Sequence, residues 1–246
     1  MNKYALVTGS AGAIGSAIVK TFRSNGYKVC GLDITDERKK LSDHFIKVDL
    51  CELVNDTDVR QALVHDVKSW LGNHKLDVLV NNAAYQYIDH EHPMPVEELI
   101  RSYNINVIAP YLLITEFAEV MSEGLASVVN IGSVHSRLTK PGFISYSITK
   151  AALAALTRGL ALDYQDLLRI NCIEPAAIET PMLLDGFKSC PEKKSDLESF
   201  HPQRRIGTPA EIAAMVLALS SDEVRFLHGA CIDMSGGISG RLHDPV

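Results

Sequence analysis

The sequence predicts a doubly wound α/β fold built on a seven-stranded parallel sheet. Short β-branched or apolar segments alternate along the chain with longer segments of helical periodicity. A glycine-rich turn joins the first strand-like segment to the first helical one, and no linker or low-complexity block interrupts the series. Alternation of this kind places parallel strands side by side with helices covering both faces of the sheet.

The elements follow one another in a regular order. The predicted strands cover residues 4–8, 28–33, 45–48, 77–81, 127–131, 169–173 and 230–233. The predicted helices cover residues 12–25, 54–71, 95–121, 144–164 and 209–221. Residues 181–205 are richer in Lys, Glu, Ser and Pro and longer than an ordinary connection, so they form either a lid or a disordered insertion; we favour a lid.

Composition limits the class of protein. With 246 residues, 46% hydrophobic and 22% charged, the chain can bury a large core, and we expect residues 1–246 to form one domain that is neither disordered nor fibrous. A net charge of −6 offers no attraction for nucleic acid. No apolar run approaches the roughly 20 residues that span a bilayer, so we expect no membrane partner and a cytoplasmic location.

The cysteines indicate neither a disulfide framework nor a zinc site. They are odd in number, widely spaced and never arranged as C-x-x-C. We interpret them as small buried residues in a reducing compartment. The five positions are Cys30, Cys51, Cys172, Cys190 and Cys231.

The first strand-to-helix turn is suited to a pyrophosphate. Glycines at positions 9, 12 and 15 let the backbone turn tightly and approach a phosphate held by the N-terminus of a helix. Asp33 ends the second predicted strand, about twenty residues further on, where a carboxylate can accept hydrogen bonds from both ribose hydroxyls. The same carboxylate would repel a 2′-phosphate, and neither Gly12 nor Ile34 offers a compensating cation, so NAD is favoured over NADP.

A second constellation could carry acid–base chemistry. Tyr146 and Lys150 stand four residues apart, on one face of a predicted helix, and Ser133 follows the fifth predicted strand. We expect the Lys150 ammonium to lower the pKa of Tyr146 from its usual value of about 10, which would let the phenol exchange a proton at physiological pH.

These residues give the chain its resemblance to a known family. Thr8-Gly9-x-x-x-Ala13-Ile14-Gly15, Asn81-Asn82-Ala83-Ala84 and the set Ser133, Tyr146 and Lys150 at their mutual spacing resemble the motifs of the classical short-chain dehydrogenases/reductases (SDR), single-domain Rossmann-fold oxidoreductases. The resemblance runs nearly from end to end. Three family glycines are alanines in this chain, at Ala13, Ala84 and Ala176, which puts cofactor affinity and ring placement in question but not the class of reaction.

The resemblance implies a role for each matched residue. Ser133 would hold the substrate oxygen, Tyr146 would act as general acid or base, and Lys150 would lower the pKa of Tyr146 and hold the nicotinamide ribose. Asn106 would order a water beside Lys150 and complete a proton relay. The implied cofactor-binding set is Gly9, Ala11, Ala13, Ile14, Gly15, Asp33, Asp49, Leu50, Asn82, Ala83, Tyr146, Lys150, Pro175, Ile178 and Thr180. The expected activity is NAD-dependent interconversion of a secondary alcohol and a ketone or aldehyde by hydride transfer.

Three polar loops, at 85–95, 134–143 and 181–205, are expected to build the substrate pocket. Their side chains suggest a polar, hydroxylated or anionic small molecule. The side chains concerned are Tyr85, Gln86, His92, His135, Arg137, Lys188, Arg204 and Arg205. His90 and His92 could be drawn as a metal site, but a solvated loop is the better interpretation, and we expect no metal.

The resemblance also implies a homo-tetramer, with a dimer as the smaller possibility, in which residues 95–121 and 144–164 meet their symmetry mates. Two other functions compete with the oxidoreductase. A catalytically silent dinucleotide-binding regulator or scaffold would show decayed catalytic residues, and none is decayed here. A nucleotide-sugar epimerase or dehydratase would need a longer chain and a differently spaced glycine turn.

Overall fold

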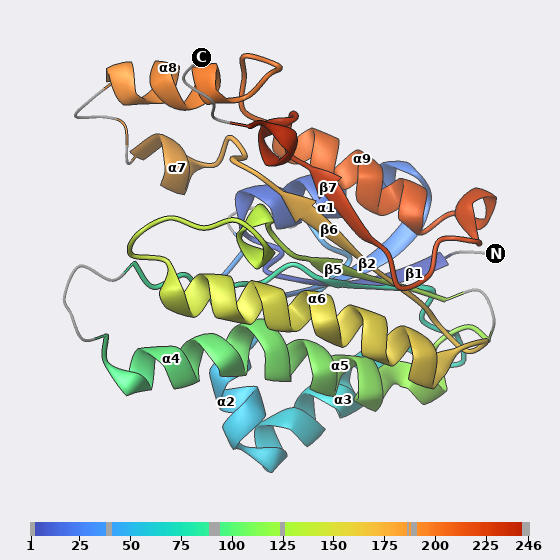
Figure 1. Ribbon diagram of the computed structural model, residues 1–246. Helices are drawn as coiled ribbons and strands as arrows, with labels where there is room; N and C mark the ends of the chain where they lie inside the picture. Colours follow the sequence, from blue (N-terminus) through green and yellow to red (C-terminus); the bar gives the residue numbers. More distant parts are fainter. Residues whose placement is uncertain are drawn as a thin grey trace.

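A seven-stranded parallel sheet forms the centre of the molecule (Figure 1). The computed structural model describes residues 3–37, 41–88, 94–123, 126–185, 187 and 191–242. The strands stand in the order β3-β2-β1-β4-β5-β6-β7, and each neighbouring pair is parallel, which confirms the predicted fold class. They are β1 (Lys3–Thr8), β2 (Tyr27–Asp33), β3 (His44–Lys47), β4 (Val78–Asn81), β5 (Ser127–Ile131), β6 (Arg169–Pro175) and β7 (Cys231–Met234).

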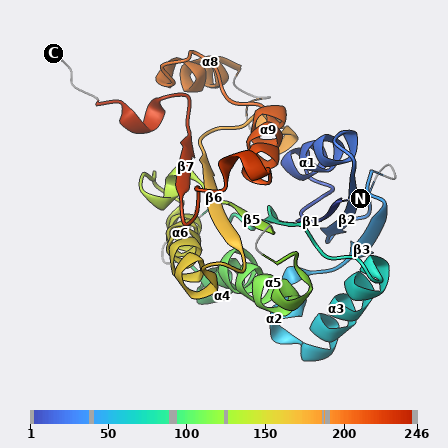
Figure 2. The same ribbon diagram turned by 90° about the vertical axis from the view of Figure 1, so that its right-hand side faces the viewer.

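Helices cover both faces of the sheet (Figure 2). Two of them, α1 (Ala13–Ser24) and α9 (Pro209–Leu219), cover one face. The opposite face carries α2 (Leu50–Asn55), α3 (Thr57–Leu71), α4 (Val96–Tyr103), α5 (Ala109–Phe117) and α6 (Ile144–Tyr164). Within the described ranges, no helix combines the length and the apolar character needed to cross a bilayer.

Alternate residues of each strand face opposite layers of the core. Leu6 of β1 packs with residues of α3 and α5, whereas its neighbours Ala5 and Val7 pack with residues of α1 and α9. All three side chains are fully buried. The strands therefore consist of almost continuous apolar residues, as expected for a sheet that is covered on both sides.

Two of the predicted helices are interrupted. The prediction of one helix over residues 54–71 was wrong, because Asp56 is extended (φ −122°, ψ 115°) and its carboxylate accepts hydrogen bonds from the Asp58 and Val59 amides, which begins α3. The predicted helix over 95–121 was wrong as a single α-helix. Between α4 and α5 lies a π-helical turn, η1 (Asn104–Ile108), and α5 ends in a 3₁₀ turn, η2 (Ala118–Val120).

The segment predicted as a lid or a disordered insertion contains two helices. They are α7 (Pro181–Asp185) and α8 (Pro191–Phe200). Both lie beyond the carboxyl ends of the strands, near the side of the sheet formed by β6 and β7 (Figure 1). Three further 3₁₀ turns complete the described structure: η3 (Val134–Ser136), η4 (Asp222–Val224) and η5 (Ile238–Gly240). Most of the described part of 181–205 is therefore helical, and the rest consists of turns and bends.

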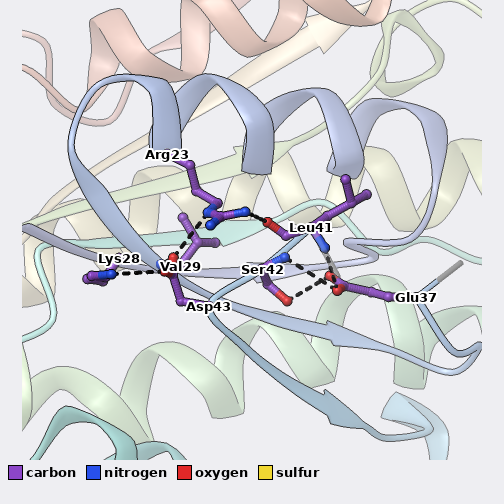
Figure 3. A network of polar contacts seen from close by, with 7 residues as sticks. All are labelled: Arg23, Lys28, Val29, Glu37, Leu41, Ser42 and Asp43. Carbon is purple, nitrogen blue, oxygen red and sulfur yellow. Dashed lines mark hydrogen bonds and ion pairs between the residues drawn. The ribbon is translucent and has the colours of Figure 1, made fainter. Parts of the chain in front are cut away.

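A polar network fixes the connection between β2 and β3 (Figure 3). The Asp43 carboxylate forms ion pairs with Arg23 of α1 at 3.3 Å and with Lys28 of β2 at 3.1 Å, and it accepts a hydrogen bond from the Val29 amide at 3.0 Å. Burial opposes ionisation, but the Val29 amide and the two cations together hold the pKa of Asp43 below the usual range. Glu37 accepts hydrogen bonds from the Ser42 hydroxyl at 2.7 Å and from the Ser42 amide at 3.3 Å. The network anchors the chain on both sides of the point where β2 ends.

Candidate functional site

The residues predicted to bind a dinucleotide lie where the strands end. The glycine turn follows β1, Asp33 ends β2, Asn82 follows β4 and Pro175 ends β6. Because all of these strands are parallel, their carboxyl ends lie along one edge of the sheet (Figure 1). This is the edge at which open α/β sheets bind their ligands.

The glycine turn leaves room for a phosphate at the N-terminus of α1. Gly9 has φ +64°, a conformation that L side chains rarely adopt, and its carbonyl accepts a hydrogen bond from the Gly12 amide at 3.2 Å. A Cβ atom at Gly15 would lie 1.9 Å from the Gly9 carbonyl oxygen. No side chain caps α1, whose first residues are Ala13, Ile14 and Gly15, so its leading amides remain able to bind an anion.

Asp33 is held in place by the turn that follows β1. One carboxylate oxygen accepts a hydrogen bond from the Ala11 amide at 2.9 Å, and the other accepts from the Thr35 amide and hydroxyl, both at 2.9 Å. These contacts connect the end of β2 directly to the pyrophosphate turn. Oδ2, which accepts only from the Ala11 amide, keeps further acceptor capacity toward a ribose hydroxyl.

Thr8 and Asn82 tie the glycine turn to the end of β4. The Thr8 hydroxyl oxygen accepts hydrogen bonds from the Asn82 and Ala83 amides, each at 3.0 Å. The Asn82 side chain returns a hydrogen bond to the Thr8 carbonyl at 2.9 Å and another to the Gly9 carbonyl at 3.1 Å. Asn82 and Ala83 therefore shape the cofactor turn from the neighbouring strand.

The remaining candidates for cofactor binding make contacts within their own part of the fold. Asp49 caps α2 by accepting a hydrogen bond from the Cys51 amide at 2.7 Å, and Leu50 beside it is buried. Ile178 pairs with Gly207 in an isolated parallel bridge. The Thr180 hydroxyl accepts a hydrogen bond from an amide of α7 at 3.3 Å.

Ser133, Tyr146 and Lys150 come together between β5 and α6. Ser133 is 6% exposed, its hydroxyl oxygen accepts a hydrogen bond from the His135 amide at 3.2 Å, and its side chain acts on the phenol of Tyr146. Lys150 is 2% exposed; its Nζ donates a hydrogen bond to the Ile131 carbonyl at 2.7 Å and lies 5.4 Å from the centre of the Tyr146 ring. The structure therefore brings together the serine, tyrosine and lysine that the sequence singled out.

The expected fall in the pKa of Tyr146 is wrong for the protein alone. Burial raises the pKa of Tyr146 to about 12, and the nearby Ser133 side chain offsets only part of that rise. Burial also lowers the pKa of Lys150 to about 8, because the ammonium has little access to water. Burial thus disfavours the charged form of each group, and an additional nearby positive charge is needed before Tyr146 can ionise readily.

Asn106 lies in the π-helical turn and is fully used in hydrogen bonds. Its amide nitrogen donates to the Tyr85 carbonyl at 2.8 Å and to the Thr149 hydroxyl at 3.0 Å, and its oxygen accepts from the Tyr85 amide at 2.7 Å. Asn106 makes no direct contact with Lys150; it connects the loop after β4 to the residue that precedes the lysine on α6. Single-turn π-helices are common at functional sites, and periodicity alone did not reveal this one.

Most of the polar side chains predicted for the substrate pocket already have partners. The Tyr85 phenol donates a hydrogen bond to Glu98 at 2.7 Å, and Arg137 forms ion pairs with Glu174 and Asp233 at 2.9 and 3.1 Å. Further partners are the Ser199 carbonyl for Arg204 and the Glu211 carboxylate for Arg205. Gln86 is exposed; His90, His92 and Lys188 lie outside the described residues.

His135 and Phe143 form an aromatic wall beside Tyr146 that the sequence reasoning only half identified. The His135 and Phe143 rings stack with centroids 4.7 Å apart, and both meet the Tyr146 ring edge-on. Burial, helped by the charge of Lys140, lowers the pKa of His135. Phe143 carried no functional signal in the sequence, because an aromatic residue before a helix usually belongs to the core.

The structure places all three of the glycine-to-alanine departures. Ala13 is the first residue of α1 and is half-buried, and Ala84 is exposed. The Ala176 amide donates a hydrogen bond to the Met234 carbonyl at 3.2 Å, which links β6 to the end of β7. In the part of the chain that the structure describes, no cluster of three or more His, Cys, Asp or Glu side chains could hold a metal ion.

Comparison with known proteins identifies the family. A family model described as enoyl-(acyl carrier protein) reductase matches residues 9–239. An oxidoreductase of Thermotoga maritima is 31% identical over 245 residues, covering 96% of each chain, and the 2-(R)-hydroxypropyl-CoM dehydrogenase of Xanthobacter autotrophicus is 29% identical, covering 96% of this chain and 98% of its own. The ligand-free aldohexose dehydrogenase of Thermoplasma acidophilum superposes with a TM-score of 0.91 at 30% identity, covering 100% of this chain and 97% of its own.

The family match extends over both parts of the site, from the glycine turn after β1 to the segment after β7. Structures of similar proteins contain either cofactor: one is of ElxO with NADP bound, and another is of 4-hydroxyisoleucine dehydrogenase with NADH. The fold, the converging Ser133, Tyr146 and Lys150 and these similarities lead to one conclusion. The chain belongs to the classical short-chain dehydrogenase/reductase family of oxidoreductases.

Proposed function

We propose that the protein is an NAD-dependent oxidoreductase that interconverts a secondary alcohol and a ketone or aldehyde in a polar, hydroxylated small molecule. The observation that carries the proposal is the convergence of Ser133, Tyr146 and buried Lys150, whose Nζ lies 5.4 Å from the centre of the Tyr146 ring, at the same end of the sheet as the uncapped N-terminus of α1. We take the whole of residues 1–246 as one catalytic domain, since a single sheet carries the residues proposed for cofactor and substrate.

Each side chain of the catalytic set has a distinct task. Ser133 orients the substrate oxygen toward Tyr146, and Tyr146 accepts the proton in alcohol oxidation or donates it in carbonyl reduction. When bound, the nicotinamide supplies the acceptor or donor of the hydride, which no protein side chain can store. Lys150 would hold the nicotinamide ribose, and Asn106 would stabilise the α6 segment through Thr149.

The cofactor site fits a dinucleotide. The close approach of Gly15 to the Gly9 carbonyl leaves no space for a side chain at position 15, and the first amides of α1 are not satisfied by a side-chain cap. The chain residues that would hold the group are those named in the sequence analysis, from Gly9 and Ala11 through Asn82 to Ile178 and Thr180.

Asp33 supports the choice of NAD. Its carboxylate is fixed by the Ala11 amide and Thr35 and would accept hydrogen bonds from the adenosine ribose hydroxyls, whereas a 2′-phosphate would meet a like charge. We expect NADH to bind at least tenfold more tightly than NADPH, which corresponds to about 1.4 kcal/mol. Asp33→Ala should remove most of this preference. Asp36→Ala, which deletes a nearby exposed carboxylate, is the matched control and should leave the preference intact.

The arginines of the proposed substrate pocket already have partners within the protein, which supports a neutral, hydroxylated substrate over an anionic one. Arg137, Arg204 and Arg205 already bind acidic or carbonyl partners, so among these arginines none stands unpartnered toward the catalytic set. The aromatic wall of His135 and Phe143 beside Tyr146 offers a face for an apolar surface such as that of a sugar ring. The similarity to an aldohexose dehydrogenase points to the same class of small molecule.

Residues 181–205 are proposed to close over the bound substrate. A cavity of about 510 Å³ lies between Ile178, in the proposed nicotinamide segment, and His201, Gln203 and Arg205 at the end of this lid. Such a cavity gives the lid space to move toward the segment that follows β6.

A substrate screen with NAD tests the activity. We expect turnover on polar polyols or aldoses, and a fall of about 10²–10⁴-fold in Tyr146→Phe with NADH affinity unchanged, because the variant loses only the acid–base hydroxyl. Full turnover by Tyr146→Phe on the true substrate would contradict the mechanism. Dinucleotide binding with no turnover on any alcohol or ketone would favour a silent regulator.

We propose further that the protein assembles as a homo-tetramer through α4, α5 and α6. Large apolar side chains stand exposed on these helices, among them Val96, Ile100, Tyr111, Ile144, Ile148 and Leu162. Leu162 is 73% exposed, so Leu162→Glu should reduce the mass measured by size-exclusion chromatography with light scattering, whereas Ile34→Glu on the loop after β2 should not. A monomeric wild-type protein at micromolar concentration would contradict the assembly.

Because Cys30, Cys51, Cys172 and Cys231 are free thiols, we place the enzyme in the reducing cytoplasm.

A further inference from the structure

Two cysteines face each other on the last two strands of the sheet. Cys172 of β6 and Cys231 of β7 are register partners, and β7 is the edge strand next to α6 (Figure 2). Neighbouring strands lie about 4.8 Å apart, within the range of Cα separations that a disulfide can bridge. Cys231 Sγ lies 3.9 Å from the Ala154 carbonyl of α6, so the cysteine pair lies under that helix.

The two neighbouring thiols differ in environment. Cys172 is fully buried, and its thiol donates a hydrogen bond to the Ile173 carbonyl at 3.7 Å. The adjacent Cys231 thiol raises the pKa of Cys172, with burial adding to the rise. The adjacent Cys172 thiol has the opposite effect on Cys231, whose pKa it lowers. The Arg158 guanidinium of α6 contacts Cys231 Sγ at 3.6 Å and stabilises its thiolate further.

We propose that Cys231 and Cys172 form an oxidisable thiol pair, with half-buried Cys231 as the nucleophile and buried Cys172 as the resolving thiol, and that a hydroperoxide converts them to a disulfide. The Cys231 thiolate attacks one peroxide oxygen, the O–O bond breaks, and sulfenic acid and hydroxide form. The Cys172 thiol then attacks the Cys231 sulfur, losing its proton as the S–O bond breaks and water leaves. One peroxide is reduced for each pair of thiols oxidised, and a dithiol reductant reverses the step.

This proposal concerns a site that the hydride-transfer chemistry does not use. Neither cysteine belongs to the set of Ser133, Tyr146 and Lys150, and the linkage requires no cofactor or substrate. A disulfide would nevertheless affect the catalytic loop. A Cβ atom at Gly132, directly before Ser133, would lie only 2.6 Å from Cys172 Sγ, so this sulfur packs against the backbone of that loop.

Peptide mapping after oxidation tests the pair directly. Cys190, outside the described residues, is first replaced in a Cys190→Ser background. The protein is treated with substoichiometric to tenfold hydrogen peroxide, alkylated, digested without reductant and analysed by mass spectrometry. We expect a Cys172–Cys231 cross-linked peptide that disappears on reduction, while Cys30 and Cys51 remain alkylatable after unfolding. Preferential oxidation of Cys30 or Cys51, or over-oxidation of Cys231 with Cys172 still reduced, would overturn the proposal.

Single variants separate the roles of the two thiols. Cys172→Ala should accumulate sulfenic acid at Cys231, detected with dimedone, and Cys231→Ser should leave Cys172 unmodified. Arg158→Gln should slow alkylation of Cys231 at neutral pH severalfold, because the thiolate loses its cationic neighbour. Because Arg158→Gln leaves both cysteines in place, an unchanged alkylation rate would overturn the assigned activation of Cys231 even if Cys172→Ala failed to fold.

The effect on catalysis rests on the proposed function and is measured separately. We expect the disulfide form to turn over substrate at least threefold more slowly than the reduced form, with recovery after reduction and no peroxide response in Cys231→Ser. A cross-link that leaves turnover unchanged would refute the coupling through Gly132. Absence of turnover in the reduced protein would refute the proposed function while leaving the mapped linkage intact.

Discussion

The Thr8 hydroxyl joins the start of the glycine turn to two backbone amides of the loop after β4. Thr8 is 1% exposed at the end of β1, and its oxygen accepts hydrogen bonds from the Asn82 and Ala83 amides, both at 3.0 Å. Thr8→Val keeps the shape and the β-branched character of the side chain but removes this acceptor. Thr8→Ser keeps the acceptor and removes one methyl group, so the two variants isolate the contribution of the hydroxyl.

The expected magnitudes differ. In Thr8→Val two backbone amides lose their partner, and at about 1–2 kcal/mol for each half-buried amide the free energy of unfolding should fall by about 2–4 kcal/mol. In Thr8→Ser the lost methyl group costs about 1 kcal/mol. Thr8→Val should therefore be about 1–3 kcal/mol less stable than Thr8→Ser. The side-chain volume alone would predict the opposite order, because valine is closer to threonine in volume than serine is.

Urea unfolding at equal protein concentration measures both values, since subunit association would otherwise shift the midpoints. NADH titration of the folded variants gives a second measurement, because the Asn82 side chain also contacts the Gly9 carbonyl. We expect Thr8→Val to bind NADH more weakly than Thr8→Ser. Equal stability of the two variants, or a more stable Thr8→Val, would refute the assignment of this hydroxyl as the anchor of the turn.

Three further predictions follow from the site. The pKa of Lys150 is lowered to about 8 in the folded protein, whereas an unfolded lysine has a pKa of about 10.4. Between these pH values the unfolded chain binds more protons at this residue, so the free energy of unfolding should rise with pH, by up to about 1.4 kcal/mol per pH unit, relative to that of Lys150→Met. Urea midpoints that change in parallel with pH in the two proteins would refute this. Gly15→Ala should weaken NADH binding at least tenfold, because its Cβ atom would lie 1.9 Å from the Gly9 carbonyl oxygen, whereas Gly12→Ala, at 3.3 Å, should have a smaller effect in the same titration; the reverse order would contradict the role of Gly15. Asn106→Leu should lower the free energy of unfolding, measured with urea, by about 1–3 kcal/mol, because the amide and the carbonyl of Tyr85 both lose their hydrogen-bond partner. An unchanged free energy of unfolding would show that water replaces the side chain.

The sequence predicted the parts of the fold that depend on local, repeated patterns. The seven strands and the sheet class followed from apolar runs that alternate with helical segments, and the glycine turn followed from residues that a tight backbone requires. The break before α3 depended on one residue, Asp56, whose capping competes with continued helix; the helical periodicity on both sides concealed it.

Within the site, the sequence identified side chains better than their environments. Spacing placed Tyr146 and Lys150 on one helix face, and the structure confirms that they are neighbours. The direction of the Tyr146 pKa was wrong, because the effect of burial depends on how tightly β5 and α6 pack around the phenol. Likewise, the pairing of Arg137 with Glu174 and Asp233 joins three segments far apart in sequence, which no local pattern can reveal.

The π-helical turn at Asn104–Ile108 has a consequence for anyone who alters the helices around it. A π turn accommodates one extra residue, and one residue corresponds to about 100° of rotation in an α-helix. The apolar stripe of α5 is therefore out of phase with that of α4 on any helical wheel drawn through both. Deleting a single residue between 104 and 108 would restore the phase, yet it would turn Asn106 away from Thr149. The extra residue of the π-helical turn thus directs the Asn106 side chain toward Thr149, and it also interrupts the apolar face that α4 and α5 would otherwise share.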